Sequence, residues 1–256
     1  MASLDPAKFE GGNRLDATDR QAAQPLVSIV IVVFRDCNEL QYIVDSILPF
    51  RTEALEIVVI DGGSTDGTVD LLRGYGNSID YWLSEPDHGI YDAMNKGMRA
   101  STGDYILHLN AGDRLLNLPW DELRRCAAEH IDVVTCRVLL DSKVVFISRT
   151  GLLSRIDNTW HHQGTFYRRA AHLGYDTTYA IYGDFEHNQH LLMRGCTTRQ
   201  LPAIVARHAG GGVSEADTGH REVYRSVATH FGWFWLQVSR LRFTLRALRA
   251  RLRTSR

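Results

Sequence analysis

The sequence predicts an α/β protein with a mixed, mainly parallel sheet flanked by helices and a C-terminal amphipathic helical tail. Apolar and β-branched runs, typical of strands buried on both faces of a parallel sheet, occur at 27–34, 56–60 and 105–109. Helical apolar patterns follow these runs, as in βαβ units, at 38–48, 68–73 and 92–100. In the tail, apolar residues recur every three or four positions from Phe234 to Leu252.

Further elements complete the predicted sheet and its cover. We expect a short strand at 79–83 and a helix at 121–128. Two more apolar runs, at 133–139 and 143–148, flank Asp141 and Ser142 and predict an antiparallel pair. The second half of the chain is therefore predicted to be mixed in its strand directions.

Composition and charge indicate a soluble globular protein. The 256 residues are 44% hydrophobic and 23% charged, with a formal net charge of −1 that gives no reason to expect nucleic-acid binding. The charge is uneven, because no acidic residue follows Glu222 whereas eight arginines lie between Arg225 and Arg256. The four cysteines are widely spaced and form no Cys-x-x-Cys pair, which favours free thiols in the cytosol over a zinc site or disulfides.

These patterns divide the chain into three parts. Residues 1–25 are polar and mixed in charge, without the apolar core of a signal peptide, and are predicted to be a disordered lead-in. The folded domain is expected at 26–220, with a nucleotide-binding half at 26–115 and a second half at 116–220. Residues 221–256 form the basic helical tail, and no run of 18 apolar residues predicts a membrane span.

Asp113 is the most informative candidate site residue. It closes the corner Asn110-Ala111-Gly112-Asp113 that ends the strand at 105–109, so its carboxylate is expected at the C-terminal edge of the sheet. Ligands of open α/β sheets collect outside that edge, and one carboxylate suits Mg²⁺ shared with phosphates. A simple turn role for this aspartate stays open.

Two other segments carry polar side chains near the predicted edge. The loop 61–67, which contains Asp61 and three glycines, allows close approach of a ligand to the backbone. On the helix at 92–100, Asp92, Asn95 and Lys96 share one face, where Lys96 is placed to meet a phosphate. An ordinary turn and a solvated helix face are the alternatives.

The second half contributes candidates for an acceptor site. His162 and Gln163 lie in an aromatic and polar stretch and are predicted to be hydrogen-bonding groups in the wall of an acceptor pocket. Asp184 precedes a helical run and is a candidate general base if it lies within hydrogen-bond reach of an acceptor hydroxyl. A helix-capping role for Asp184 is the alternative.

Five segments in register resemble the family 2 inverting glycosyltransferases with the GT-A fold, and in particular bacterial members that build exopolysaccharides and glycolipids. The resemblance covers roughly residues 26–215. The segments are 58–68, 87–97, 109–113, His162-Gln163 and Gly211-Gly212-Val213-Ser214.

The resemblance implies a role for each candidate. Asp61 would bind the base or ribose of a nucleoside-diphosphate sugar, and Asp113 would hold Mg²⁺ or Mn²⁺ on the diphosphate. Asp184 would match the catalytic base that deprotonates the acceptor hydroxyl. Glu186 is a rival base, because Gly183 stands where relatives often carry an acid.

The nucleotide side departs from the family pattern in two places. Val32-Val33-Phe34-Arg35 stand where the first strand of relatives often ends in Pro-Thr-Tyr-Asn, so we expect Val33 and Phe34 beside the nucleotide, with Phe34 as a stacking ring. Asn110 and Gly112 replace the other acids of the Asp-x-Asp-type motif, which leaves Asp113 as the charged ligand.

A basic amphipathic helix that begins with Trp233 and Phe234 suits the surface of an anionic membrane. We therefore expect a cytoplasmic enzyme, peripheral on the inner face of the membrane, with a glycan or lipid-linked acceptor. Packing of the tail on the domain or on a second copy is the alternative. A nucleotidyltransferase of sugar phosphates and a non-catalytic GT-A-like binding protein remain alternative functions.

Overall fold

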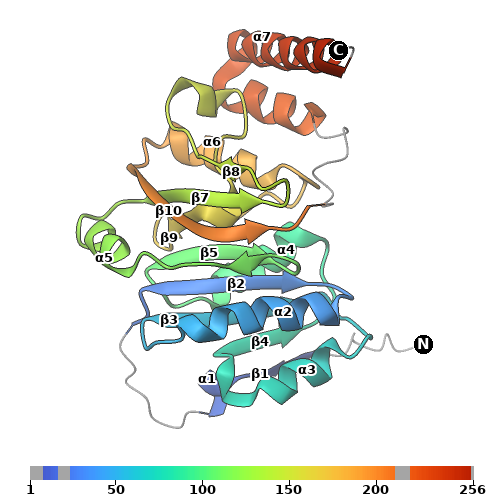
Figure 1. Cartoon of the computed structure of the whole chain (residues 1–256), viewed down its shortest axis with the longest axis vertical. Helices are drawn as coiled ribbons and strands as arrows, with labels where there is room; N and C mark the ends of the chain where they lie inside the picture. The colour runs from blue at the N-terminus through green and yellow to red at the C-terminus, as the bar shows by residue number, and fades with distance from the viewer. Residues whose placement is uncertain (1–7, 17–23, 211–219, 255–256) are drawn as a thin grey trace.

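The computed structural model describes residues 8–16, 24–210 and 220–254 (Figure 1). Its strands are β1 (Phe9–Gly11), β2 (Val27–Val33), β3 (Leu55–Asp61), β4 (Tyr81–Ser84), β5 (Tyr105–Asn110), β6 (Arg114–Leu115), β7 (Val133–Leu140), β8 (Val145–Phe146), β9 (Thr165–Arg168) and β10 (Thr198–His208). Its helices are α1 (Asn13–Asp16), α2 (Cys37–Ile47), α3 (Thr68–Tyr75), α4 (Ile90–Ala100), α5 (Trp120–Ala128), α6 (Gly183–Met193) and α7 (His220–Thr254). Within these residues no helix is long and apolar enough to cross a bilayer.

In the described part of the chain the strands form one sheet in the order β1-β4-β3-β2-β5-β9-β7-β10-β6, with β8 paired to β7. The four strands β4, β3, β2 and β5 run parallel, as does the long pair β7 and β10. Strand β9 is antiparallel to both β5 and β7 and joins the two parallel groups. The sheet is therefore mixed and mainly parallel, as predicted.

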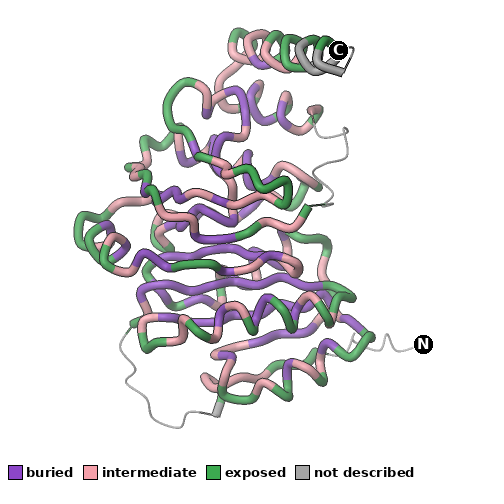
Figure 2. Tube along the Cα trace, in the orientation of Figure 1, coloured by how far each residue is buried: buried purple, intermediate pink, exposed green. Residues whose placement is uncertain are grey.

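Both faces of the central strands are covered, which explains their continuous apolar sequence. Alternate side chains of β2, such as Ile29 and Ile31, pack with α2, α3 and α5 on one face. The intervening residues Val30 and Val32 pack with Ala93 and Met94 of α4 on the other face. Figure 2 shows these central strands buried along their length.

Residues 8–16 correct the prediction of a disordered lead-in at 1–25. Strand β1 pairs antiparallel with β4 at the sheet edge, and Arg14 donates a 2.8 Å hydrogen bond to the buried Glu56. These partners are far away in sequence, so local composition gave no sign of them. Residues 1–7 and 17–23 of that segment lie outside the described residues.

The second half contains one long strand that the sequence analysis missed. Strand β10 carries charged and polar residues and a proline, and it is buried at fewer than half of its positions. Its pairing with β7 and β6 places His208, its last residue, beside the corner that follows β5. The antiparallel pair β7 and β8 confirms the expected hairpin.

Candidate functional site

A cavity of about 610 Å³ opens at the carboxyl ends of β2 and β5. The predicted residues that line it come from both halves of the chain: Val33, Phe34, Asn110, His162 and Asp184. Other aromatic and polar side chains complete its wall, among them Asp87, Tyr91, Asn158, Trp160, His161 and Tyr182. The location agrees with the rule that open α/β sheets bind ligands beyond their carboxyl edge.

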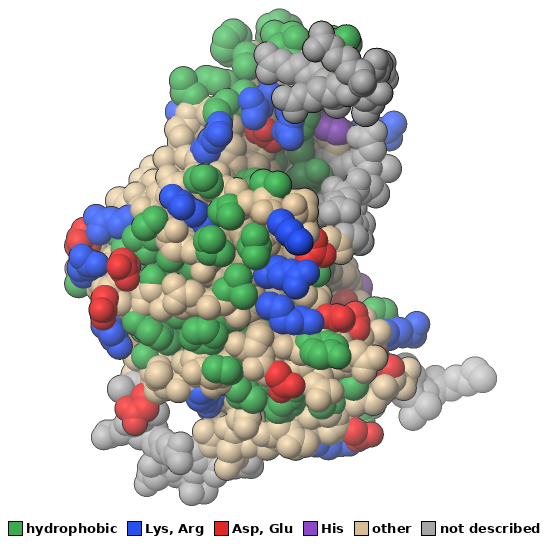
Figure 3. All heavy atoms as spheres, viewed as in Figure 1, with side chains coloured by type: hydrophobic (Ala, Val, Ile, Leu, Met, Phe, Trp, Pro, Cys, Tyr) green, Lys and Arg blue, Asp and Glu red, His purple; other side chains and the backbone are tan. Residues whose placement is uncertain are grey.

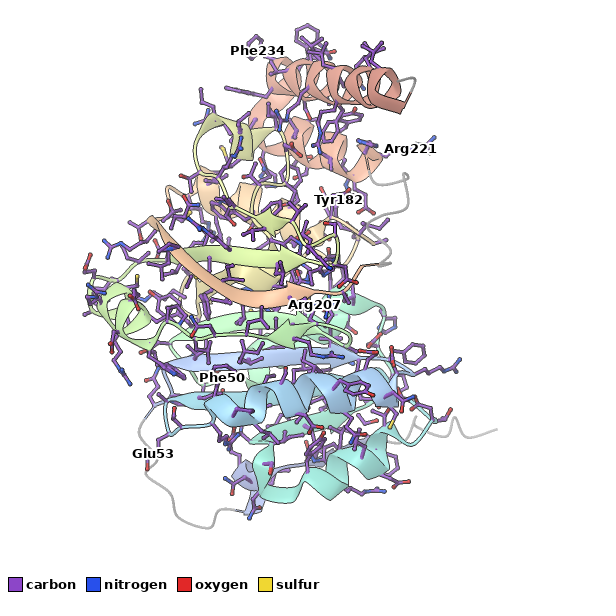
Figure 4. All side chains as sticks on the ribbon, in the orientation of Figure 1. Phe50, Glu53, Tyr182, Arg207, Arg221 and Phe234 are labelled. Carbon is purple, nitrogen blue, oxygen red and sulfur yellow. The ribbon has the colours of Figure 1, made fainter. Side chains whose placement is uncertain are left out.

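A second hollow of about 530 Å³ adjoins the first, because both are lined by Asp36, Asn110, Ala111 and His208. The second hollow is also lined by the buried Asp113 and by Arg207 and Asp141, which form an ion pair. Figure 3 shows basic and acidic side chains close together over this end of β10. In Figure 4, Arg207 marks the end of β10 and Tyr182 lies between the sheet and α7.

Asp113 is 2% exposed and its carboxylate accepts four hydrogen bonds. Oδ2 accepts from the amide of Asn110 at 2.9 Å and from Nε2 of Gln163 at 3.0 Å. Oδ1 lies 3.1 Å from Nδ1 of His208 and accepts from the amide of Ala209 at 3.2 Å. The turn that brings Asp113 to this position contains Gly112 at φ 98°, a conformation that favours glycine.

Opposing effects set the charge of Asp113. Burial raises the pKa of this carboxyl group, but the hydrogen bonds from His208 and from the Asn110 amide, with the nearby His162, lower it by more. The net pKa lies below the ordinary value of an aspartate. The carboxylate is therefore ionised at neutral pH, as a metal ligand must be.

The surroundings of Asp113 fit a divalent cation. Oδ1 of Asn110 and Oε1 of Gln163 are buried without a hydrogen-bond partner in the described residues, although buried polar atoms are normally paired. Amide and carboxylate oxygens are the donors that Mg²⁺ and Mn²⁺ prefer, and imidazole suits several divalent metals. No group of three His, Cys, Asp or Glu side chains forms a metal cluster within the described residues. The atoms available to a cation are therefore the carboxylate of Asp113, the imidazole of His208 and the amide oxygens of Asn110 and Gln163.

Asp184 lies in the first turn of α6 and faces the first cavity. Its Oδ1 accepts a 2.8 Å hydrogen bond from the amide of Phe185, and its Oδ2 accepts from Nδ2 of Asn158 at 3.2 Å. Burial raises the pKa of Asp184, but the hydrogen bond and charge of His162 and the bonds from Asn158 and Phe185 lower it by more. The carboxylate is therefore held in the form that accepts a proton.

Glu186, the rival base, faces elsewhere. Its Oε1 lies 2.9 Å from Nε2 of His230 on α7, and it does not line either hollow. The two acids are two residues apart on a helix and so point in different directions. The geometry places Asp184, and not Glu186, at the cavity.

His162 connects the two acidic centres. Its Nδ1 lies 3.5 Å from Oδ2 of Asp184, and its Nε2 lies 3.2 Å from Nδ2 of Asn110. The backbone of Asn110 in turn donates to Asp113. Gln163, the next residue, is fully buried and contacts Asp113 and His208 rather than the cavity.

Asp61 is fully buried at the end of β3 and lines neither hollow. Its carboxylate accepts hydrogen bonds from the amide and hydroxyl of Ser64 and, at 2.6 Å, from the hydroxyl of Ser84. Ser64 also accepts a 2.7 Å hydrogen bond from the amide of Arg35. In this structure Asp61 therefore supports the loop that carries Phe34 instead of reaching the cavity itself.

The three polar residues of α4 also lie outside the cavity wall. Lys96 Nζ contacts Glu85 at 2.9 Å and Asp92 at 3.7 Å, which confirms that Asp92 and Lys96 share a helix face. The side-chain amide of Asn95 donates to the carbonyl of Tyr175 at 2.8 Å through Nδ2 and accepts from the amide of Tyr175 at 2.7 Å through Oδ1. These residues hold the segments on either side of the cavity.

The sequence analysis missed His208. A signal was available, because this histidine lies three residues before the segment Gly211-Gly212-Val213-Ser214 that contributed to the resemblance. That segment lies outside the described residues. Trp160 begins the aromatic and polar stretch that is predicted to form the wall of an acceptor pocket, whereas Tyr182 had no sequence signal that separates it from core aromatics.

Solved structures share this architecture. The chain superposes on S. aureus TarS 1–349 in complex with UDP with a TM-score of 0.60 and 15% identity, over 80% of this chain and 64% of that one. A mannosyltransferase from Pyrobaculum calidifontis, in complex with GDP-Man and Mn²⁺, gives a TM-score of 0.55 and 18% identity, over 81% and 62%. At these identities the likeness shows the fold, which is GT-A.

Sequence comparisons show the family. A PGL/p-HBAD biosynthesis glycosyltransferase of Mycobacterium bovis is 31% identical over 200 residues, which cover 73% of this chain and 77% of the relative. An uncharacterized glycosyltransferase of Mycobacterium tuberculosis is 43% identical over 91 residues, so the match spans 35% of that relative's length. The model of the glycosyl transferase family 2 matches residues 28–183. The chain therefore belongs to glycosyltransferase family 2.

Proposed function

We propose that this protein transfers a sugar from a nucleoside-diphosphate sugar to an acceptor hydroxyl, with inversion and with the help of a divalent metal. One observation carries the proposal: Asp184 and Asp113, both ionised and buried, face adjoining hollows and are linked through His162 and Asn110. A base and a diphosphate site in adjoining hollows are the two parts that a single displacement needs.

In this reaction Asp184 accepts the proton of the acceptor hydroxyl as the hydroxyl oxygen attacks the anomeric carbon of the donor. The bond between that carbon and the diphosphate oxygen breaks, and the nucleoside diphosphate leaves with the electron pair. His162 and Asn158 keep the Asp184 carboxylate oriented toward the cavity. Inversion follows because attack and departure occur on opposite faces of the sugar.

Asp113 and His208 would hold Mg²⁺ or Mn²⁺, with the amide oxygens of Asn110 and Gln163 as further donors. When bound, the metal offsets the charge that develops on the departing diphosphate. The Mn²⁺ named with the P. calidifontis mannosyltransferase supports this cofactor. The four hydrogen bonds of Asp113 keep its carboxylate charged and fixed in place before a ligand arrives.

The donor is proposed to occupy the part of the cavity lined by Val33, Phe34 and Asn110. The UDP, UDP-GlcNAc and GDP-Man named with the structural neighbours support a nucleoside-diphosphate sugar. Four further polar residues of the predicted nucleotide side do not line the cavity, and their proposed role is to fix the neighbouring loops in place: Asp61, Asp92, Asn95 and Lys96.

The acceptor is proposed to be a glycan or a lipid-linked glycan, reached from the side of His162 and Tyr182. The M. bovis relative is named for PGL/p-HBAD biosynthesis, and an acceptor of the class used there is proposed for this chain. In this assignment residues 26–220 form the catalytic domain, with donor and acceptor halves that meet near residue 115. Residues 221–256 form a tail that keeps the enzyme at the inner face of the membrane.

The test is a thermal-shift panel of UDP, GDP and dTDP and their sugars, each with and without Mn²⁺. A ligand at about 100 times its Kd stabilises the folded state by about 2.7 kcal/mol, which is readily measured. We expect a metal-dependent shift with one base, followed by release of that nucleoside diphosphate when acceptor is added. If no ligand shifted the melting temperature, the proposal would be wrong. If a ligand bound but no nucleoside diphosphate was released on addition of acceptor, a non-catalytic binding protein would be favoured.

A further inference from the structure

Helix α7 consists of two segments joined at Gly232, whose φ of 81° and ψ of −177° are not helical. The first segment packs against α6, where Val223 and Val227 bury Phe185. The second segment, from residue 233 to 254, lies at the end of the molecule opposite to β1 (Figure 1). We call this second segment the terminal helix.

One side of the terminal helix is firmly attached to the domain. Trp235, Leu236 and Phe243 pack against the cluster around Phe185, and the buried Ser239 donates a 2.8 Å hydrogen bond to the carbonyl of Ile156. Arg242 and Arg246 both bind Oδ2 of Asp157, at 2.7 and 3.0 Å. The orientation of the helix is therefore set by contacts along its inner side.

The opposite side is an exposed apolar stripe. Its five side chains are between 45% and 69% exposed, and their spacing of 7, 4, 3 and 4 residues puts them on one face: Phe234, Leu241, Leu245, Leu248 and Leu252. Figure 3 shows hydrophobic side chains along this end of the molecule, and Figure 4 shows Phe234 pointing away from the domain. Trp233 adds a ring that is 74% exposed. Apolar stripes of this extent usually mark a contact surface.

The charges beside the stripe identify its partner. The terminal helix contains six arginines and no acidic residue, and Asp157 forms ion pairs with two of these arginines, Arg242 and Arg246. A second copy of this helix would bring arginines against arginines with no carboxylate of either terminal helix to pair them. An anionic lipid surface instead supplies both the apolar layer and the opposite charge.

We infer that the terminal helix lies flat in the headgroup layer of an anionic bilayer, with the stripe inserted and with the net positive charge of the helix attracted to the lipid phosphates. This inference deepens the proposed function, because it names the surface through which a lipid-linked acceptor is approached. The first segment of α7 connects that surface with the cavity. Its Glu222 accepts hydrogen bonds of 2.8–2.9 Å from the amides of Ala180, Ile181 and Tyr182, and these three residues line the cavity.

The experiment is flotation of the full chain with vesicles of phosphatidylcholine, with and without phosphatidylglycerol, at low and high salt. We expect binding to the anionic vesicles and much weaker binding to the neutral ones. The double variant Leu241→Ser/Leu245→Ser should weaken binding to anionic vesicles by roughly tenfold or more, since the buried apolar area falls. High salt should reduce the binding of the unchanged chain.

The matched control is Leu15→Ser/Val144→Ser, which replaces two apolar side chains of similar exposure, 53% and 58%, far from α7 in sequence. It should bind as the unchanged chain does. The inference would be overturned if both double variants lost vesicle binding equally. It would also be overturned if the unchanged chain bound equally well to vesicles with and without phosphatidylglycerol. A third contrary result would be that the unchanged chain sediments as a dimer and the Leu241→Ser/Leu245→Ser variant as a monomer, because the stripe would then be a contact between two copies. Vesicle binding needs neither donor nor acceptor, so its failure is distinguishable from failure of the proposed turnover.

Discussion

The imidazole of His162 lies 3.5 Å from the carboxylate of Asp184 through Nδ1 and approaches Asn110 through Nε2. The ring therefore stands between the candidate base and the corner that carries Asp113. Since His162 and Asp184 come from segments that are 22 positions apart, the contact depends on how α6 packs beside the short 3₁₀ turn at His162–Gly164. This relationship leads to the first three predictions.

Asp184→Asn should lower turnover by about 10²–10⁴-fold, the usual contribution of a general base, and leave donor binding intact. Glu186→Gln is the matched control, since Glu186 lies on the same turn but pairs with His230 outside the cavity. Release of nucleoside diphosphate and a separate donor-binding titration measure the two effects. Equal loss of turnover in both variants would contradict the assignment of the base.

Asp113→Asn should abolish the metal-dependent part of nucleotide binding. The variant keeps the shape of the side chain but removes the charge that a cation requires. Calorimetric titration of UDP, GDP or dTDP with Mn²⁺ measures it. Asp141→Asn is the control, because Asp141 lines the same hollow but pairs with Arg207. Undiminished Mn²⁺ dependence in Asp113→Asn would place the metal elsewhere.

Asn158→Ala should shift the acid limb of the kcat/KM profile to higher pH. The pKa of Asp184 is lowered by His162 and then by the hydrogen bond from Asn158, so loss of that bond lets burial raise the pKa. Asp184 is the group that must be deprotonated, so activity then begins to fall at a less acidic pH. A profile with an unchanged acid limb would show that another group limits the rate.

Acid should destabilise the fold through three buried histidines, His108, His172 and His187. Burial lowers the pKa of each, to about 3 for His172. The unfolded chain takes up protons near pH 6.5 and the folded state does not, so the free energy of unfolding falls as the pH drops below 6.5. Each such histidine contributes a slope of up to about 1.4 kcal/mol per pH unit.

His108→Leu should remove one of these contributions, because both ring nitrogens of His108 are buried without a partner in the described residues. Urea unfolding at pH 7 and pH 5 measures the change in slope. His88→Leu is the control, as the side chain of His88 is 94% exposed. An unchanged pH dependence in His108→Leu would refute the account.

Gly97→Ala should destabilise the protein by about 1–3 kcal/mol through overpacking. An added Cβ would clash with Cγ1 of Val30, so α4 would have to move away from β2. Gly74→Ala in α3 meets nothing within 4 Å and should stabilise by about 0.5–1 kcal/mol. Denaturant midpoints of the two variants should therefore move in opposite directions.

The periodic elements could be predicted from the sequence because their burial is regular. The run at 27–34 is buried at every position of β2, and the predicted helix at 92–100 matches α4 to within two residues. Strand β10 could not be predicted, because its alternation is interrupted at Pro202 and its pairing with β7 shifts register twice. Strand β1 depends on a partner that lies about 70 positions away.

The residue types of the site could be predicted, but not which atoms face the cavity. Asp113 and Asp184 stand out through their sequence context, and both lie at the hollows. Asp61 stands out equally in the sequence, but its buried carboxylate accepts hydrogen bonds from Ser64 and Ser84 and does not face the cavity. The choice between Asp184 and Glu186 depends on the rotation of α6, which no local pattern specifies.

The triple hydrogen bond at Glu222 has a mechanical consequence. The backbone amides of three successive residues in the cavity wall all donate to the Glu222 carboxylate near the start of α7. The position of this part of the wall therefore depends on the position of α7. Under the membrane binding inferred above, a shift of α7 on the bilayer would therefore be transmitted through Glu222 to the wall of the cavity.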